Sequence, residues 1–170
     1  MALDATIGGA SANSYITVAD ADLYFTDRYS SDEWDALGDE VKAKLLVTAS
    51  LQLDWRVDWI GVKQTVEQAM EWPRVDVACM EPLYGTVEAP ALPPILSKAV
   101  CELAVYLVEY GDPSALNDLD AIRLSRLSID FNEDKKSGTD LVPDFLCAML
   151  SSIGSCKTAY PKLRQAKLWR

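Results

Sequence analysis

The side chains that most often carry out chemistry are sparse in this sequence. It contains no histidine, which excludes Ser-His-Asp and Cys-His catalysis and removes the usual acid–base group near neutral pH. Acids lie close together as Asp20 with Asp22 and as Glu133 with Asp134, and such pairs could bind Mg²⁺ in a nuclease. Because acids one or two residues apart do not converge on one point, we interpret them as solvated surface charges.

No phosphate-binding motif accompanies these residues. Neither G-x-x-x-x-G-K-[ST] nor G-x-G-x-x-G occurs, and Gly8 with Gly9 alone is no nucleotide signal. Ser14, Ser50 and Ser128 have no nearby base in the sequence, so we interpret them as helix caps or surface residues. We therefore expect no catalytic residue, no cofactor, no metal site and no enzymatic activity.

Binding to nucleic acid needs separate consideration, because phosphates attract Lys and Arg. The chain has a net charge of −10, yet its last 14 residues hold five basic residues and no acid. This local charge of +5 leaves −15 on residues 1–156. We expect the acidic part to repel DNA, so that only the basic segment could bind it.

Aromatic residues could offer stacking surfaces for bases, since the chain has five tryptophans and seven tyrosines. Four of the tryptophans lie among apolar residues at helical spacing, namely Trp34, Trp55, Trp59 and Trp72. We therefore predict that these four rings pack in the core and are not available to bases.

The cysteines indicate a reducing compartment. Cys79, Cys101, Cys147 and Cys156 are far apart, without a C-x-x-C motif, and the N-terminus lacks the pattern of a signal peptide. We interpret them as buried small hydrophobic side chains, not as disulfides. No apolar run approaches the roughly 20 residues of a membrane span, so we expect a protein made and kept in a cytoplasm.

Helical patterns dominate the first half of the chain, whose 170 residues fit one domain. Thr17 followed by Asp20 resembles a capping box and predicts a helix to about Arg28. A short turn of helix over 31–38 precedes a long helix that begins at Asp39. The apolar positions of that helix recur near the helical period: Val41, Leu45, Ala49 and Leu53, widened by Leu46 and Leu51.

Prolines organise the next part of the chain. Thr65 and Gln68 form a second capping-box pattern, which predicts a short helix that Pro73 ends. A proline-rich, irregular connection leads to Pro94, where the clearest helix begins and continues to Gly111. Two long antiparallel helices are therefore expected to form the core.

The last third changes character. Residues 121–131 alternate apolar and polar side chains at strand period, which predicts a β-hairpin, and a last helix is expected from Pro143 to Gly154. The predicted fold class is mainly α, a single-domain helical bundle with a minor β-hairpin and extended N- and C-terminal arms. Its predicted divisions are an N-terminal arm at 1–16, a helical domain at 17–154 and a basic C-terminal tail at 155–170.

Three stretches resemble a family of phage and prophage proteins. Residues 12–25, ANSYITVADADLYF, are similar to the family's opening motif ANSYVSVAEADAYF. Residues 67–74, EQAMEWPR, are similar to its QALAWPR motif. Residues 94–107 are similar to its IPxAVKxAxCELA segment, with CELA at 101–104 matching closely.

This resemblance identifies the chain as similar to the head–tail adaptor (connector) proteins of tailed phages, some of which are labelled DnaT-like single-stranded-DNA-binding proteins. It implies a helical subunit of a dodecameric ring. Its partners would be the portal protein, further copies of itself, another neck, stopper or tail protein, and genomic DNA that passes through the lumen without specific binding. No membrane partner is expected. The acidic surface would give the channel a wall that repels phosphates.

The resemblance also assigns roles to residues. In such adaptors a C-terminal segment docks on the portal, and here that segment would comprise Tyr160, Lys162, Leu163, Arg164, Lys167, Leu168, Trp169 and Arg170. Contacts with a neighbouring subunit or the next ring are expected at Tyr15, Arg126, Asp130, Glu133 and Asp134. The expected location is the neck of the virion, after assembly in the host cytoplasm. Two alternatives stay open, a single-stranded-DNA-binding accessory factor for replication and a lone regulatory or interaction domain.

Overall fold

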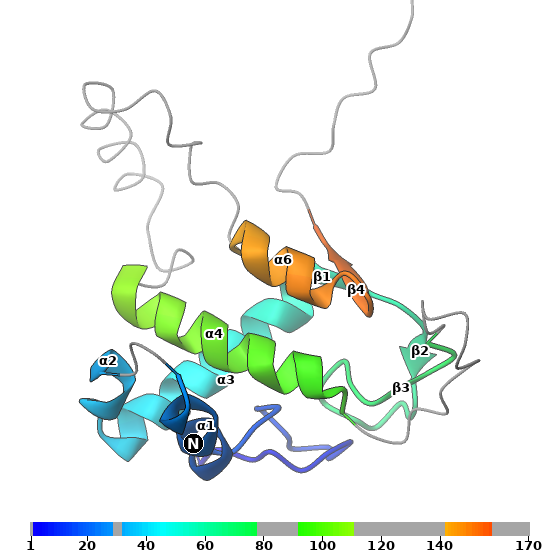
Figure 1. Ribbon diagram of the computed structural model, residues 1–170. Helices are drawn as coiled ribbons and strands as arrows, with labels where there is room; N and C mark the ends of the chain where they lie inside the picture. The colour runs from blue at the N-terminus through cyan, green and yellow to red at the C-terminus, as the bar shows by residue number, and fades with distance from the viewer. Residues whose placement is uncertain (1, 29–31, 78–91, 111–141, 158–170) are drawn as a thin grey trace, which may run out of the picture.

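The computed structural model describes residues 2–28, 32–77, 92–110 and 142–157 (Figure 1). These ranges are mainly α-helical, as predicted, and carry two antiparallel two-stranded sheets. The elements are α1 (Val18–Thr26), α2 (Asp32–Asp35), α3 (Asp39–Arg56), β1 (Val57–Trp59), β2 (Val62–Lys63), β3 (Arg74–Val75), α4 (Pro94–Tyr110), α6 (Asp144–Leu150) and β4 (Gly154–Cys156). None of the helices in these ranges is long and apolar enough to cross a membrane.

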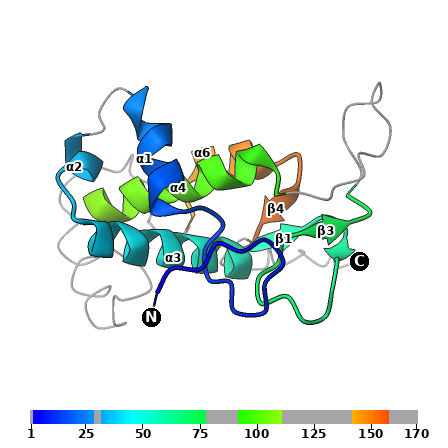
Figure 2. The same ribbon diagram turned by 90° about the horizontal axis from the view of Figure 1, so that it is seen from below.

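Helices α3 and α4 form the centre of the fold. They run antiparallel and pack against each other, with α6 on α4 and α1 beside both (Figures 1 and 2). The prediction of two long antiparallel helices in the core is thereby confirmed, because each helix presents one apolar stripe that only a second helix can cover.

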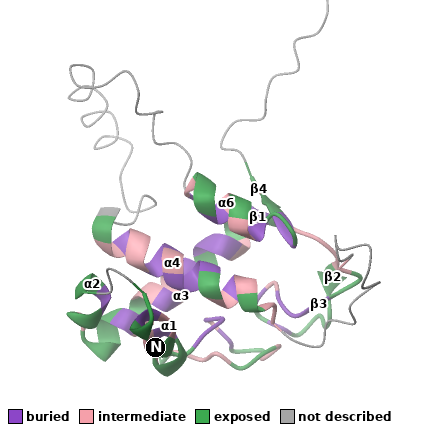
Figure 3. Ribbon diagram, viewed as in Figure 1, coloured by how far each residue is buried: buried purple, intermediate pink, exposed green. Residues whose placement is uncertain are grey.

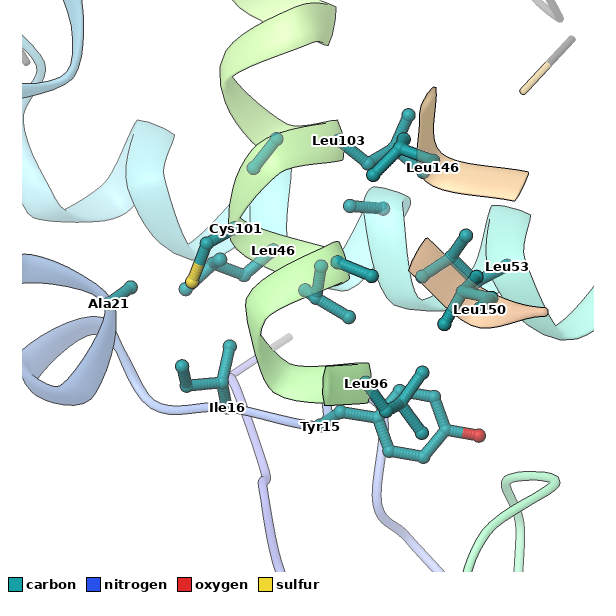
Figure 4. Close-up of a cluster of buried hydrophobic side chains, with 14 of the residues drawn as sticks. Tyr15, Ile16, Ala21, Leu46, Leu53, Leu96, Cys101, Leu103, Leu146 and Leu150 are labelled. Carbon is teal, nitrogen blue, oxygen red and sulfur yellow. The ribbon is translucent and has the colours of Figure 1, made fainter. Parts of the chain in front are cut away.

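The core is built from leucines of three helices. Figure 4 shows Leu46 and Leu53 of α3, Leu96 and Leu103 of α4, and Leu146 and Leu150 of α6 gathered together, and none of these side chains is exposed. Figure 3 shows the same pattern as buried residues on the facing sides of α3, α4 and α6. Burying a leucine side chain completely contributes about 2 kcal/mol, so these contacts fix how the three helices pack.

Helix α1 begins where the capping pattern predicts. The hydroxyl of Thr17 accepts a hydrogen bond from the backbone N–H of Asp20 at 3.1 Å, which satisfies an N–H that the first turn leaves open. Phe25 at the other end of the helix packs on Trp34 of α2, with ring centroids 4.9 Å apart. This contact holds α1 and α2 together at one end of the molecule (Figure 1).

The last described segment differs from its prediction. The helix expected to reach Gly154 ends at Leu150, and residues 154–156 instead form β4, which pairs with β1. A disulfide joins Cys147 of α6 to Cys156 of β4. The interpretation of these two cysteines as small hydrophobic side chains is therefore wrong, whereas Cys101 is free and buried in α4. The basic tail predicted from residue 155 also begins inside a strand.

The short helix predicted between Thr65 and Pro73 is absent, and an irregular loop takes its place. One half of the predicted capping box does form, because the Thr65 backbone N–H donates to the Gln68 side chain at 3.0 Å. The amide of buried Gln68 then donates to the carbonyls of Met70 and Pro73. This side chain satisfies the loop's backbone groups, which removes the need for helical hydrogen bonds.

Close backbone approaches hold both small sheets. Gly61, at φ +80°, turns the chain between β1 and β2, and a Cβ there would lie 2.2 Å from the carbonyl oxygen of Val75. Gly154 begins β4, where a Cβ would lie 2.6 Å from Cγ1 of Val57. Both positions therefore need glycine. The hairpin predicted at 121–131 lies outside the described residues.

Candidate nucleic-acid interface

An exposed tryptophan stands at the C-terminal turn of α3. The side chain of Trp55 is 62% exposed, whereas Trp34 and Trp72 are 0% and 2% exposed. Residue 55 lies on the side of α3 opposite to buried Leu46 and Leu53, because each helical residue turns by about 100°. The prediction of a core position is therefore confirmed for Trp34 and Trp72 and wrong for Trp55.

Trp59 is the fourth of these tryptophans and belongs to the interior. It lies in β1, is half-buried, and meets the Trp72 ring edge-on at 5.9 Å between centroids. Such edge-to-face pairs are favoured by the ring quadrupoles. Only Trp55 among these four rings thus presents most of its surface to solvent.

Lys157 contacts the backbone of the residue that carries this indole. Its ammonium donates to the backbone carbonyl of Trp55 at 3.0 Å and lies 3.4 Å from a carboxylate oxygen of Asp58. Its backbone N–H donates to the carbonyl of Arg56 at 2.7 Å. The pairing of β4 with β1 brings residue 157 to this position, 102 residues along the chain from Trp55. We call Trp55 and Lys157 together the Trp55 surface.

The rest of the basic segment continues from this point in the sequence. Residues 158–170 carry Lys162, Arg164, Lys167 and Arg170 and no acid. The densest positive charge of the sequence therefore follows directly after Lys157, whose ammonium contacts the backbone of Trp55.

Arg74 and Lys63 are engaged within the protein, as Lys157 is with Asp58. Arg74 donates to the carbonyls of Ile60 and Gly61 at 3.0 and 2.6 Å and pairs with Glu71 at 2.6 Å. Lys63 pairs with the same carboxylate at 3.2 Å. These groups hold the loop between β2 and β3 in place, and Glu71 balances one of their two positive charges.

A buried polar cluster supports the end of α3 beside the Trp55 surface. The Tyr15 hydroxyl donates to the carboxylate of Asp54, which also accepts the Glu71 backbone N–H at 3.1 Å. The hydroxyl of Tyr15 in turn accepts the Trp72 backbone N–H at 3.2 Å. Burial raises the pKa of Asp54 to about 6 and raises the pKa of Tyr15 strongly.

Tyr15 therefore has a different role from the predicted one. It was expected to contact a neighbouring subunit, yet its side chain is 6% exposed and faces Asp54 within the same chain. Its residue type suits both positions, because a tyrosine has an apolar body and one polar tip. Only the fold brings Asp54, 39 residues away, to that tip.

The acidic pair on α1 is structural. Asp22 accepts hydrogen bonds from the Lys42 ammonium at 2.8 Å and the Trp34 indole at 2.7 Å. Although partial burial opposes the shift, these hydrogen bonds lower the pKa of Asp22. Asp20 belongs to the Thr17 cap. The described residues contain no group of three side chains that could hold a metal ion.

The serines also serve the fold. Ser50 is completely buried in α3 and its hydroxyl accepts the Tyr15 backbone N–H at 3.2 Å. Buried Ser14 donates to the carbonyl of Ile16 at 2.8 Å. The interpretation as caps or surface residues is therefore wrong for both, and Ser128 lies outside the described residues.

Most of the predicted assembly residues fall outside the described ranges. This holds for Arg126, Asp130, Glu133 and Asp134, and for the whole predicted portal-docking set at 160–170. Their roles stay predictions that rest on the adaptor interpretation.

Comparison with known proteins overturns that interpretation. The family model that matches this chain is described as "Putative DnaT-like ssDNA binding protein", and the match covers residues 1–165. No curated protein and no solved structure matches the chain.

The match corrects several predictions at once. The adaptor family, the ring role and the portal and neck partners were inferred from motifs at 12–25, 67–74 and 94–107, but the matching model describes single-stranded-DNA binding. The three motifs contain no catalytic or DNA-contacting signature. Their residues therefore do not distinguish a head–tail adaptor from a single-stranded-DNA-binding protein. The prediction that genomic DNA only passes through the protein without specific binding is wrong for the same reason. The predicted location in a virion neck stays an untested prediction. Because the match spans nearly the whole sequence, this chain belongs to the DnaT-like single-stranded-DNA-binding family.

Proposed function

We propose that this chain binds single-stranded DNA at the Trp55 surface, with the indole stacked on a base and Lys157 beside a phosphate. The exposed indole of Trp55 carries the proposal, because a 62% exposed tryptophan at the root of a basic segment offers both contacts that a single strand needs. The family match supports the same ligand.

A single strand suits this surface better than a duplex. Unpaired bases expose their faces to an aromatic ring, whereas the bases of a duplex are already stacked on each other. Among the described residues, the cation Lys157 contacts the Trp55 backbone. Further phosphate contacts would come from residues 158–170, which hold four of the five basic residues of this segment.

The acidic surface restricts where DNA can approach. Residues 1–156 carry −15, and the exposed acids Asp32, Glu33, Asp39 and Glu40 lie on α2 and the start of α3. Trp55 lies at the opposite end of α3, about 24 Å away along the helix axis at 1.5 Å per residue. DNA is thus repelled from one end and attracted to the other.

We further propose that the role is binding and not catalysis, carried out by one mainly helical domain that includes buried Tyr15 and strand β4. Catalytic groups would need a general base or a metal, and the absent histidine removes the commonest base. In the described residues, polar side chains such as Asp22 and Ser50 form hydrogen bonds that hold the fold together.

The test is a fluorescence titration with oligothymidylate, comparing wild type with Trp55→Ala. Loss of one stacked base should weaken binding by about 5- to 150-fold, from 1–3 kcal/mol per stacking contact. The quenching of tryptophan emission should fall at the same time. Phe145→Ala is the matched control, because Phe145 is also an exposed aromatic residue (47%) but lies on α6.

Equal affinities of wild type and Trp55→Ala would remove the stacking role. Absence of any oligonucleotide binding by the wild-type chain at low salt would overturn the proposed function itself.

A further inference from the structure

A second apolar stripe runs along the outer face of α3. Val41, Leu51 and Trp55 are 46%, 42% and 62% exposed, and Thr48 lies between them. With Lys44, these positions are spaced three and four residues apart, which is the heptad spacing of helices that pair. The stripe extends about 21 Å along the helix at 1.5 Å per residue.

This face is opposite to the core face of α3. The buried residues Leu46 and Leu53 point toward α4, and α1, α4 and α6 all lie on one side of α3 in Figure 2. On the other side no described helix or strand covers Val41, Leu51 and Trp55, while Ala2, Leu3 and Asn13 of the N-terminal segment line a hollow together with Lys44 and Thr48. A surface helix normally has one apolar face, so a second one indicates a partner.

A hollow lies next to the stripe near its N-terminal end. It has a volume of about 490 Å³ and is lined by Leu3, Ala43, Val47, Thr48 and Glu40, among others. Its lining also includes Lys44 and Asn13, and its volume is large enough for an aromatic side chain. Such a side chain stands at the other end of the same stripe, at Trp55.

We propose that a second copy of this chain pairs with α3 in antiparallel orientation, with a two-fold axis at Thr48. Residue 48 is midway between 41 and 55, so each Trp55 then lies opposite the partner's Val41 and enters the hollow beside it. One patch meets the same patch, as a two-fold interface requires.

Charge favours the same orientation. The N-terminal end of α3 carries the exposed acids Asp39 and Glu40. Its C-terminal end carries Arg56 and contacts Lys157, with Asp58 as one acid beside these two cations. Antiparallel pairing sets each acidic end against a basic end and aligns the two helix dipoles favourably. Parallel pairing would place like charges together.

The pairing also bears on DNA, and this part rests on the proposed function. Trp55 cannot occupy the partner's hollow and stack on a base at once, so the pair and the DNA complex exclude each other. If only the monomer binds DNA, the apparent dissociation constant equals that of the monomer divided by the monomeric fraction. Single-stranded DNA should therefore dissociate the pair.

The experiment compares sedimentation of the full chain over a dilution series with that of three variants. Wild type should be a dimer that dissociates on dilution. Thr48→Glu should be monomeric, because two carboxylates meet at the axis. Thr65→Glu adds the same charge at an exposed loop position and should behave as wild type, while Thr48→Leu should dimerise more tightly because it adds an apolar contact at the centre.

A wild-type monomer at every concentration, or a dimer that survives Thr48→Glu, would overturn the pair. The same samples are then titrated with oligothymidylate, where Thr48→Leu should bind more weakly than wild type. If Thr48→Leu dimerises more tightly but keeps the wild-type affinity, the exclusion is wrong. If wild type dimerises and no variant binds DNA, the pair stands and the proposed function fails.

Discussion

Asp54 precedes Trp55 in the last turn of α3, and its surroundings favour the neutral form. Burial raises its pKa from 3.8 to about 6, despite the hydrogen bonds from Tyr15 and from the Glu71 backbone N–H. The native state therefore binds more protons than the unfolded chain between about pH 4 and 6. The contribution of Asp54 to stability is present below the unfolded pKa and is lost as pH rises through the folded pKa.

We expect Asp54→Asn to remove this pH dependence. The free energy of unfolding of wild type should fall by up to about 3 kcal/mol between about pH 4 and 7 from this group, since one pKa unit corresponds to about 1.4 kcal/mol. The asparagine of the variant does not titrate, so its free energy of unfolding should not fall in this way. Urea unfolding at a series of pH values measures the difference.

Asp58→Asn is the control for that series, because the Asp58 side chain is 69% exposed. It should keep the wild-type dependence on pH. An unchanged slope in Asp54→Asn would mean that another group is responsible.

At the scale of elements, the disulfide between α6 and β4 ties two segments that the backbone joins only through a short turn. Cys147 and Cys156 are nine residues apart. Closing so small a loop in the unfolded chain contributes about 2–3 kcal/mol in the chain-entropy model. Strand β4 also positions Lys157, so its stability matters for the Trp55 surface.

We expect Cys147→Ser with Cys156→Ser to lower the free energy of unfolding by about 2–3 kcal/mol under oxidising conditions. Wild type treated with a dithiol reductant should show a similar loss, and the double variant should no longer respond to reductant. Denaturant unfolding with and without reductant measures both effects.

Cys101→Ser supplies the comparison for a buried cysteine outside the disulfide. That variant should keep the response to reductant. Equal stability of oxidised and reduced wild type would show that β4 is held by its pairing with β1 alone.

At the scale of the whole molecule, the charge is divided between an acidic body and a basic end. Single-stranded DNA releases counterions for each phosphate that a cation neutralises, and the slope of log K against log salt is about −0.7 per contact. If the five basic residues of 157–170 all contact phosphates, the slope approaches about −3.5.

We expect a chain that ends at Lys157 to show a slope of only about −0.7, because four of the five cations are removed. Its stacking on Trp55 should persist, so that quenching at saturation stays similar while affinity falls. Titrations at several salt concentrations measure both quantities. A slope that does not change on truncation would place the phosphate contacts elsewhere on the molecule.

Local signals in the sequence predict the helices. The Thr17 cap, the start at Asp39 and the proline start at Pro94 each lie within one turn of the helix they begin, and α1, α3 and α4 form there. Helical periodicity also identified the two helices that pack at the centre. It does not tell which of the two apolar faces of α3 is buried, and Val41, at one of the predicted apolar positions, is 46% exposed.

The candidate site depends on contacts between segments that are far apart in the sequence. The pairing of β1 with β4 brings Lys157 to Trp55, and the fold brings Tyr15 to Asp54, 39 residues away. Gln68 forms hydrogen bonds within its own loop, where a helix was predicted. Strands of two or three residues have no periodicity to detect, and their hydrogen bonds join residues far apart in sequence. Local patterns describe a residue's neighbours along the chain, whereas burial and charge pairing depend on neighbours in space, which the packing of α3 against α4 sets.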